Sequence, residues 1–183
     1  NLNGLLIIEP KVFGDHRGWF METYSKRVFS ENGIDIDFVQ DNQSFSATEG
    51  TLRGLHYQMN PMAQTKLIRC TKGAVFDVAV DIRIGSLSYG KWFGIELNEE
   101  NKKQLLVPKG FAHAFMTLTE NVVVQYKVDE YYAPEYDRSI IWNDPDIGIK
   151  WPLDITPVLS DKDEEAPLLK DIDNNFVYGG EYI

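Results

Sequence analysis

Short runs of β-branched and aromatic residues, separated at close intervals by turn residues, constrain the fold of this chain most. In residues 75–82, Asp77 and Asp81 recur four positions apart among apolar residues, a spacing that leaves both carboxylates on one face of a strand. Further runs of this kind occupy residues 5–8, 19–24, 37–45, 52–58, 66–71, 74–84, 91–97, 103–107, 112–118 and 122–128. About ten short strands at such spacing predict an all-β sandwich or barrel.

Helical signals are few. Ser25 can cap a helix that ends at Gly33, and the acidic run after Ser160 predicts one helical turn that includes Asp163. The sequence after Tyr131 is richer in Pro, Asp and Trp, which predicts a C-terminal tail (about 131–183) wrapped over the barrel. No polar linker divides the chain, so residues 1–183 are expected to form a single domain.

Charge and composition exclude several classes of partner. Lys and Arg number 18 against 28 Asp and Glu, a net charge of −10, which disfavours nucleic acid polymers and anionic membranes. No apolar run approaches the ~18 residues that span a bilayer, and no signal-peptide pattern opens the chain. The single Cys70 predicts a small core residue in a reducing cytoplasm. A first residue of Asn1 rather than Met indicates a processed or trimmed N-terminus.

Two of the three histidines lie in predicted strands, near basic and phenolic side chains. Histidine titrates near neutral pH and is a common proton carrier. Removing a proton next to a ketone requires a base, a cation for the developing enolate and an acid. His56 can be the base, and Tyr126 can be the acid. Arg53 and Lys66, expected on the same strand as His56 or on an adjacent one, can supply positive charge. A carboxylate often orients such a histidine, but the 28 acidic residues leave the choice open on spacing alone.

A metal site is the alternative reading of the same histidines. The pattern Pro108-x-Gly110-x-x-His113 resembles the second motif of the cupin superfamily, whose enzymes usually bind a metal. Together with His56 and a carboxylate, His113 could hold Fe(II) in an oxygenase. No carboxylate follows His56 at the expected spacing, however, so the sequence favours a site without a metal.

Longer segments resemble the dTDP-4-dehydrorhamnose 3,5-epimerase family, and they follow the family's order from about residue 5 to residue 163. They lie at residues 13–22, 40–44, 52–58, 77–81, 85–91, 108–113 and 142–145. The resemblance implies a cupin-like jelly-roll homodimer that uses neither a metal nor an organic cofactor. The implied reaction converts dTDP-4-dehydro-6-deoxy-D-glucose to dTDP-4-dehydro-L-rhamnose by inversion at C3 and C5, in dTDP-rhamnose biosynthesis.

The resemblance also implies roles for individual residues. His56 would accept the proton with Asp163 as its partner, Tyr126 would donate a proton on the opposite face of the sugar, and Lys66 would steady the enolate oxygen. Residues implied in binding the sugar nucleotide are Arg17, Phe20, Glu22, Gln40, Asp41, Asn42, Arg53, His113, Asp137 and Lys162.

Small departures from the family pattern leave the substrate preference open. Ala114 stands where the family often has Gly, and Gln43 stands where it often has His. Epimerases that invert only C3 or only C5 use the same chemistry, and a non-catalytic sugar-nucleotide-binding cupin is a further alternative. An exposed N-terminal strand at residues 5–8 would present an edge that a second copy could cover, which agrees with the implied homodimer.

Overall fold

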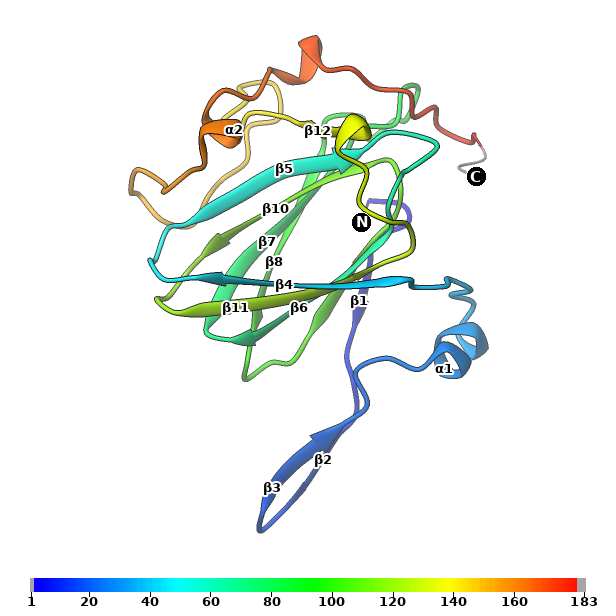
Figure 1. Cartoon of the computed structure of the whole chain (residues 1–183), viewed down its shortest axis with the longest axis vertical. Helices are drawn as coiled ribbons and strands as arrows, with labels where there is room; N and C mark the ends of the chain where they lie inside the picture. The colour runs from blue at the N-terminus through cyan, green and yellow to red at the C-terminus, as the bar shows by residue number, and fades with distance from the viewer. Residues whose placement is uncertain (1, 181–183) are drawn as a thin grey trace.

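The computed structural model describes residues 2–180, which contain two facing five-stranded antiparallel sheets (Figure 1). In spatial order, the first sheet consists of β1 (Leu6–Ile8), β9 (Gln104–Val107), β6 (Lys66–Lys72), β11 (Val122–Val128) and β4 (Gln40–Ser46). The second consists of β12 (Asp137–Ser139), β5 (Leu52–Gln58), β10 (Phe111–Thr117), β7 (Ala74–Asp81) and β8 (Trp92–Asn98). The predicted all-β jelly roll is therefore confirmed.

Two apolar layers stabilise this arrangement, one on each face of the second sheet. Between the sheets, Ala79 and Phe111 pack with residues of the first sheet such as Ile68, and Cys70 is buried in this layer as expected. On the outer face, Val78 and Val80 pack against residues of the C-terminal segment, namely Ile140, Ile147, Leu169 and Phe176. The alternation in β7 therefore sorts residues between two cores, because successive side chains of a strand point to opposite faces.

The N-terminal part of the chain departs most from the predicted strands. β2 (Val12–Asp15) pairs with β3 (Gly18–Met21) in a hairpin that projects away from the two sheets (Figure 1). The strand predicted over residues 19–24 is β3, which begins at Gly18 and ends at Met21. β2 was not predicted. The predicted helix is α1 (Lys26–Glu31), and the Ser25 side chain accepts a hydrogen bond from the N–H of Val28.

Two other boundaries also differ from the predictions. The strand predicted over residues 74–84 ends at Asp81, because Arg83 folds back onto that carboxylate with its backbone N–H and its guanidinium. The short strand β12 was not predicted, since its three residues carry no apolar alternation.

The C-terminal segment contains η1 (Pro134–Tyr136), α2 (Asp161–Glu164) and η2 (Leu169–Asp171), and it crosses the outer side of the second sheet (Figure 1). The buried carboxylate of Asp144 accepts hydrogen bonds from the N–H groups of Asp146, Ile147 and Leu169, which ties two parts of this segment together. Within residues 2–180 no helix is long and apolar enough to cross a membrane. Asn1 lies outside the described residues, and a single domain over 1–183 stays a prediction, as does a cytoplasmic location.

Candidate active site

A hollow of about 400 Å³ between the two sheets contains six of the predicted site residues. Arg53 and His56 come from β5, His113 from β10, Lys66 from β6 and Tyr126 from β11, while Asp163 comes from α2. Other residues that line the hollow are Ser44, Thr51, Leu52, Phe115, Val158, Leu159 and Ser160.

The lining residues come from opposite sheets, and this corrects one expectation. Lys66 was expected on the same strand as Arg53 and His56 or on an adjacent one, but β6 and β5 belong to different sheets. The side chain of Lys66 crosses the interior, and its Nζ donates to the backbone carbonyl of His56 at 3.4 Å. A molecule in the hollow would therefore meet His56 on one side, and Lys66 and Tyr126 from the other sheet.

His56 forms a close pair with Asp163, which lies 107 positions further along the chain. The distance from Nε2 of His56 to Oδ1 of Asp163 is 2.5 Å. Burial acts to raise the pKa of Asp163, but hydrogen bonds from His56, Ser160 and the backbone of Gly54, together with the charge of His56, outweigh it and lower that pKa. An ionised carboxylate accepts only, so Nε2 of neutral His56 carries the proton and Nδ1 is the basic nitrogen.

His113 has a carboxylate partner of its own. Its Nε2 lies 3.0 Å from each carboxylate oxygen of Asp77, and both residues are buried. His113 and His56 are directly opposite each other on paired strands, yet each Nε2 is held by a different acid. Residues 2–180 contain no group of three or more His, Cys, Asp and Glu side chains arranged to hold a metal ion.

Burial shifts the pKa values of the two groups contributed by the first sheet. It lowers the pKa of Lys66 from 10.5 to about 8, although the nearby carboxylates of Asp137 and Asp77 act in the opposite direction. Burial raises the pKa of the Tyr126 phenol, against the effect of the neighbouring Arg53 charge. At neutral pH, Lys66 is therefore mostly an ammonium ion, and Tyr126 holds its proton.

Polar groups also surround the rim of the hollow. Arg53 spans from β5 to β4, where its Nε donates to Ser46 Oγ at 3.2 Å and its Nη2 donates to the Phe45 carbonyl at 3.1 Å. Ser44 Oγ, on the same strand, is buried and has no hydrogen-bond partner within the described part of the chain. Asp137 and Lys162, which are not among the residues that line the hollow, pair with each other at 2.5 Å, so β12 is linked directly to α2.

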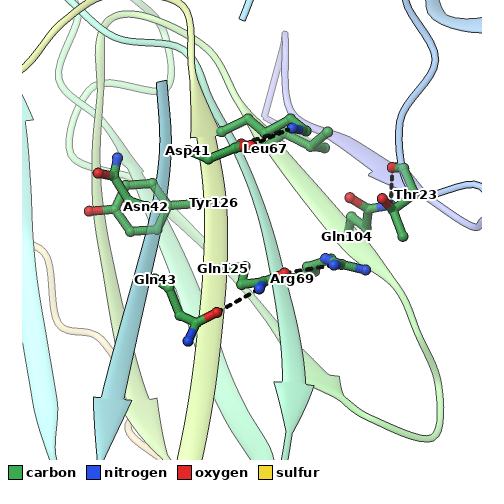
Figure 2. Close-up of a pocket in the computed structure, with 10 residues that line it drawn as sticks. Thr23, Asp41, Asn42, Gln43, Leu67, Arg69, Gln104, Gln125 and Tyr126 are labelled. Carbon is green, nitrogen blue, oxygen red and sulfur yellow. Dashed lines mark hydrogen bonds and ion pairs between the residues drawn. The ribbon is translucent and has the colours of Figure 1, made fainter. Parts of the chain in front are cut away.

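The predicted binding segment on β4 divides between the two faces of its sheet. Asn42 lies directly opposite Tyr126 in the strand register and accepts a hydrogen bond from Gln40, two residues away on the same face. Asp41 points to the outer face, where Lys127 donates to it at 2.8 Å. Figure 2 shows this outer face, with a chain of hydrogen bonds that runs from Gln43 through Gln125 to Arg69.

Like Gln40, Asp41 and Asn42, three further residues predicted to contact the nucleotide lie outside the hollow. Arg17, at the turn between β2 and β3, pairs with Asp15. Phe20 is 70% exposed on the hairpin, and Glu22 lines a separate groove between the hairpin and α1. Neither the hairpin nor Glu22 borders the hollow of the same chain.

Two contributors to the site were not singled out from the sequence. Ser160 was read only as a helix cap, yet its Oγ also donates to Oδ2 of Asp163 at 2.9 Å. Gly54 supplies a backbone hydrogen bond to the same carboxylate, and its backbone φ of +116° is rarely adopted by residues that carry a side chain. The Ser-x-x-Asp spacing from 160 to 163 was the sequence signal that could have identified Ser160 as a partner of Asp163.

Comparison with known proteins identifies the family. A family model described as dTDP-4-dehydrorhamnose 3,5-epimerase matches residues 1–171. The chain belongs to the dTDP-4-dehydrorhamnose 3,5-epimerase family. Curated members include proteins of Sinorhizobium fredii, 53% identical over 94% of this chain and 88% of the relative, and of Salmonella typhimurium, 54% identical over 90% of each.

Solved structures of a dTDP-4-dehydrorhamnose 3,5-epimerase and of a dTDP-6-deoxy-D-glucose-3,5-epimerase have the same fold. The Bacillus anthracis enzyme with TDP and PPi bound is 50% identical over 92% of this chain and 95% of that chain, with a TM-score of 0.90. The Legionella pneumophila enzyme in complex with dTDP-4-keto-L-rhamnose is 49% identical over 92% of this chain and 89% of that chain, with a TM-score of 0.89.

Proposed function

We propose that His56, Tyr126 and Lys66 carry out the epimerisation typical of the family. The activity is that of a dTDP-4-dehydrorhamnose 3,5-epimerase, an isomerase of dTDP-rhamnose biosynthesis. The substrate is dTDP-4-dehydro-6-deoxy-D-glucose, in which C3 and C5 flank the C4 ketone. The observation that carries the assignment is one hollow with the His56–Asp163 pair on one side and Tyr126 with Lys66 on the other.

The proposed chemistry begins with proton removal next to the ketone. Nδ1 of His56 takes the proton from C3 or C5, and the electron pair moves through the C–C bond to the C4 oxygen. Asp163 stabilises the imidazolium that forms, because a buried carboxylate 2.5 Å from Nε2 interacts strongly with positive charge. The Lys66 ammonium stabilises the enolate oxygen, since a preorganised charge in a buried site acts without rearrangement.

Inversion requires that the returning proton come from the other face of the sugar. Tyr126 lies on β11, in the sheet opposite to β5, and its phenol is protonated at neutral pH. Its OH would give the proton to the carbon while the enolate becomes a ketone again. The cycle closes when His56 loses the substrate proton and the Tyr126 phenolate gains one from water.

The remaining predicted residues are proposed to bind the dTDP group. Arg53 supplies a fixed positive charge at the rim, and the buried Ser44 Oγ, without a partner in the described chain, is free to donate to a phosphate oxygen. His113 lines the hollow, whereas Gln40, Asn42 and the Asp137–Lys162 pair lie outside it and would contact the part of the sugar nucleotide that extends beyond it.

We also propose that the enzyme is a homodimer. Arg17, Phe20 and Glu22 lie away from the hollow of their own chain, so they could contact a nucleotide only in a second copy. Among the described residues β1 lies at the edge of its sheet, where a second copy could pair with it, and the hairpin exposes large apolar side chains such as Trp19. Sedimentation should give twice the chain mass; a monomer with full activity would contradict the proposal.

Incubation with dTDP-4-dehydro-6-deoxy-D-glucose in D₂O tests the proposed reaction. NMR spectra should show deuterium at both C3 and C5 and a product with the L-rhamno configuration. Deuterium at only one carbon would indicate a monoepimerase. No exchange at either carbon would contradict the proposed function. Elemental analysis tests the metal-dependent oxygenase alternative, which a metal-free protein with full activity would rule out.

A further inference from the structure

The carboxylate of Asp163 is held at both of its oxygens. Oδ1 lies against Nε2 of His56, and Oδ2 accepts a hydrogen bond from Ser160 Oγ at 2.9 Å. Because both oxygens have a fixed partner, the plane of the carboxylate cannot rotate without breaking one of these bonds. Together with the backbone hydrogen bond from Gly54, Ser160 therefore sets which way the carboxylate faces.

Besides His56 and Ser160, the backbone of Gly54 also hydrogen-bonds this carboxylate, and the helix around it is short. α2 is only four residues long, and Asp163 is its one buried residue. The preceding chain is tied to the start of β5, where the N–H of Leu52 donates to the Val158 carbonyl at 3.0 Å. Ser160 follows two residues later, so it lies between this anchored point and the His56 partner.

One hydroxyl serves two purposes at this position. Ser160 Oγ accepts a hydrogen bond from the backbone N–H of Asp163, which caps α2, and donates its own proton to Oδ2 of the same residue. A hydroxyl can do both, because it has one proton and two lone pairs. Alanine can do neither, whereas threonine keeps both abilities.

We propose that Ser160 is a positioning residue for the proton transfer, acting through Asp163 to hold the proton of neutral His56 on Nε2. This inference rests on the proposed function, in which Nδ1 of His56 must be unprotonated to act as the base. With Oδ2 released from Ser160, the Gly54 backbone bond restrains the carboxylate less tightly, so the carboxylate can turn away from Nε2 and part of the His56 population carries its proton on Nδ1. That tautomer cannot accept a proton from the sugar.

The kinetic test compares three substitutions at this position. Ser160→Ala and Ser160→Gly should each lower kcat about tenfold, as expected for one hydrogen bond to an ionised group, with KM within about twofold of the parent value. Ser160→Thr should restore kcat to within about threefold. Glycine is a tolerated helix cap, so a role in capping alone would leave Ser160→Gly nearly normal, and that result would overturn the proposal.

A matched control removes a helix cap elsewhere. Ser25 caps α1 in the same manner and lies outside the hollow, so Ser25→Ala should leave kcat within about twofold of the parent value. A comparable loss of kcat in Ser25→Ala would mean that general loosening of the fold, rather than orientation of Asp163, explains the effect.

Nitrogen-15 NMR of the imidazole rings gives a readout that needs no variant. Neutral His56 in the parent protein should carry its proton on Nε2, and Ser160→Ala should shift part of the population to Nδ1. A parent His56 protonated on Nδ1 would overturn the inference even if the variants failed to fold. His56→Ala separates the role of Ser160 from the proposed role of His56 as the base. If His56→Ala is inactive while Ser160→Ala has normal activity, only the role of Ser160 is wrong. If His56→Ala stays active, the proposed base is wrong.

Discussion

Replacing Lys66 with methionine should stabilise the protein while it removes activity. Methionine has a similar length but no charge, and the Lys66 side chain is buried between the sheets. Burial lowers its pKa from 10.5 to about 8, which corresponds to a cost of about 3 kcal/mol for keeping the ammonium in the folded state, at 1.36 kcal/mol per pKa unit. Lys66→Met should therefore raise the free energy of unfolding at pH 7 by up to about 3 kcal/mol.

The pH dependence of this gain follows from linkage. Between the folded pKa of about 8 and the ordinary value of 10.5, the unfolded chain binds more protons at Lys66 than the folded chain does. The stability of the parent protein therefore gains from this residue as pH rises through that range. The advantage of Lys66→Met should shrink to about 1 kcal/mol at pH 9.5.

Urea denaturation of both proteins at pH 7 and pH 9.5 measures these differences, and a kinetic assay at pH 7 measures activity. We expect kcat to fall at least about a hundredfold, because the variant has no cation at the enolate oxygen. Lys150→Met, at an exposed position, should change stability by less than about 0.5 kcal/mol at either pH. A variant less stable than the parent at pH 7, or a gain independent of pH, would refute the reasoning.

Three further predictions concern the scaffold of the site. Gly54→Ala should destabilise the protein by about 2–5 kcal/mol in urea denaturation, because Gly54 has a φ of +116° and a new Cβ would lie 2.5 Å from the His113 carbonyl oxygen. Gly33→Ala, a control with open space around the new Cβ, should cost only about 1 kcal/mol. Asp144→Asn should cost about 2–3 kcal/mol, since an amide cannot accept all three N–H bonds; an unchanged unfolding midpoint would contradict this role. The Cys70 thiol, whose pKa burial raises to about 11, should resist alkylation at pH 8 until the chain is denatured, and rapid labelling of the native protein would show that the core opens readily.

Strands were predictable where a long apolar pattern lies within a buried sheet. Residues 52–58 and 122–128 were expected as strands, and β5 and β11 have these bounds. β2 and β12 were missed because they are short and polar or exposed, and form only through pairing with a neighbouring strand. Pairing of this kind is a tertiary interaction, which a local pattern does not contain.

The site was predictable in its residue types but not in its geometry. His56 could be selected because there are only three histidines and few other side chains titrate near neutral pH, whereas Tyr126, one of nine tyrosines, depended mainly on the family resemblance. Their placement in opposite sheets depends on the topology of the whole barrel, and this topology cannot be inferred from the spacing of residues along the chain. Asp163 could not be chosen from spacing among 28 acidic residues, since it reaches His56 across 107 positions; the family resemblance supplied it.

The central claim is that His56 removes a proton on one side of the sugar and Tyr126 returns one on the other. It is tested most directly by comparing His56→Ala and Tyr126→Phe with the parent protein on dTDP-4-dehydro-6-deoxy-D-glucose in D₂O. His56→Ala should incorporate no deuterium at C3 or C5. Tyr126→Phe should still exchange through His56 but form almost no inverted product. Deuterium incorporation by His56→Ala at the parent rate, or normal inversion by Tyr126→Phe, would contradict the account.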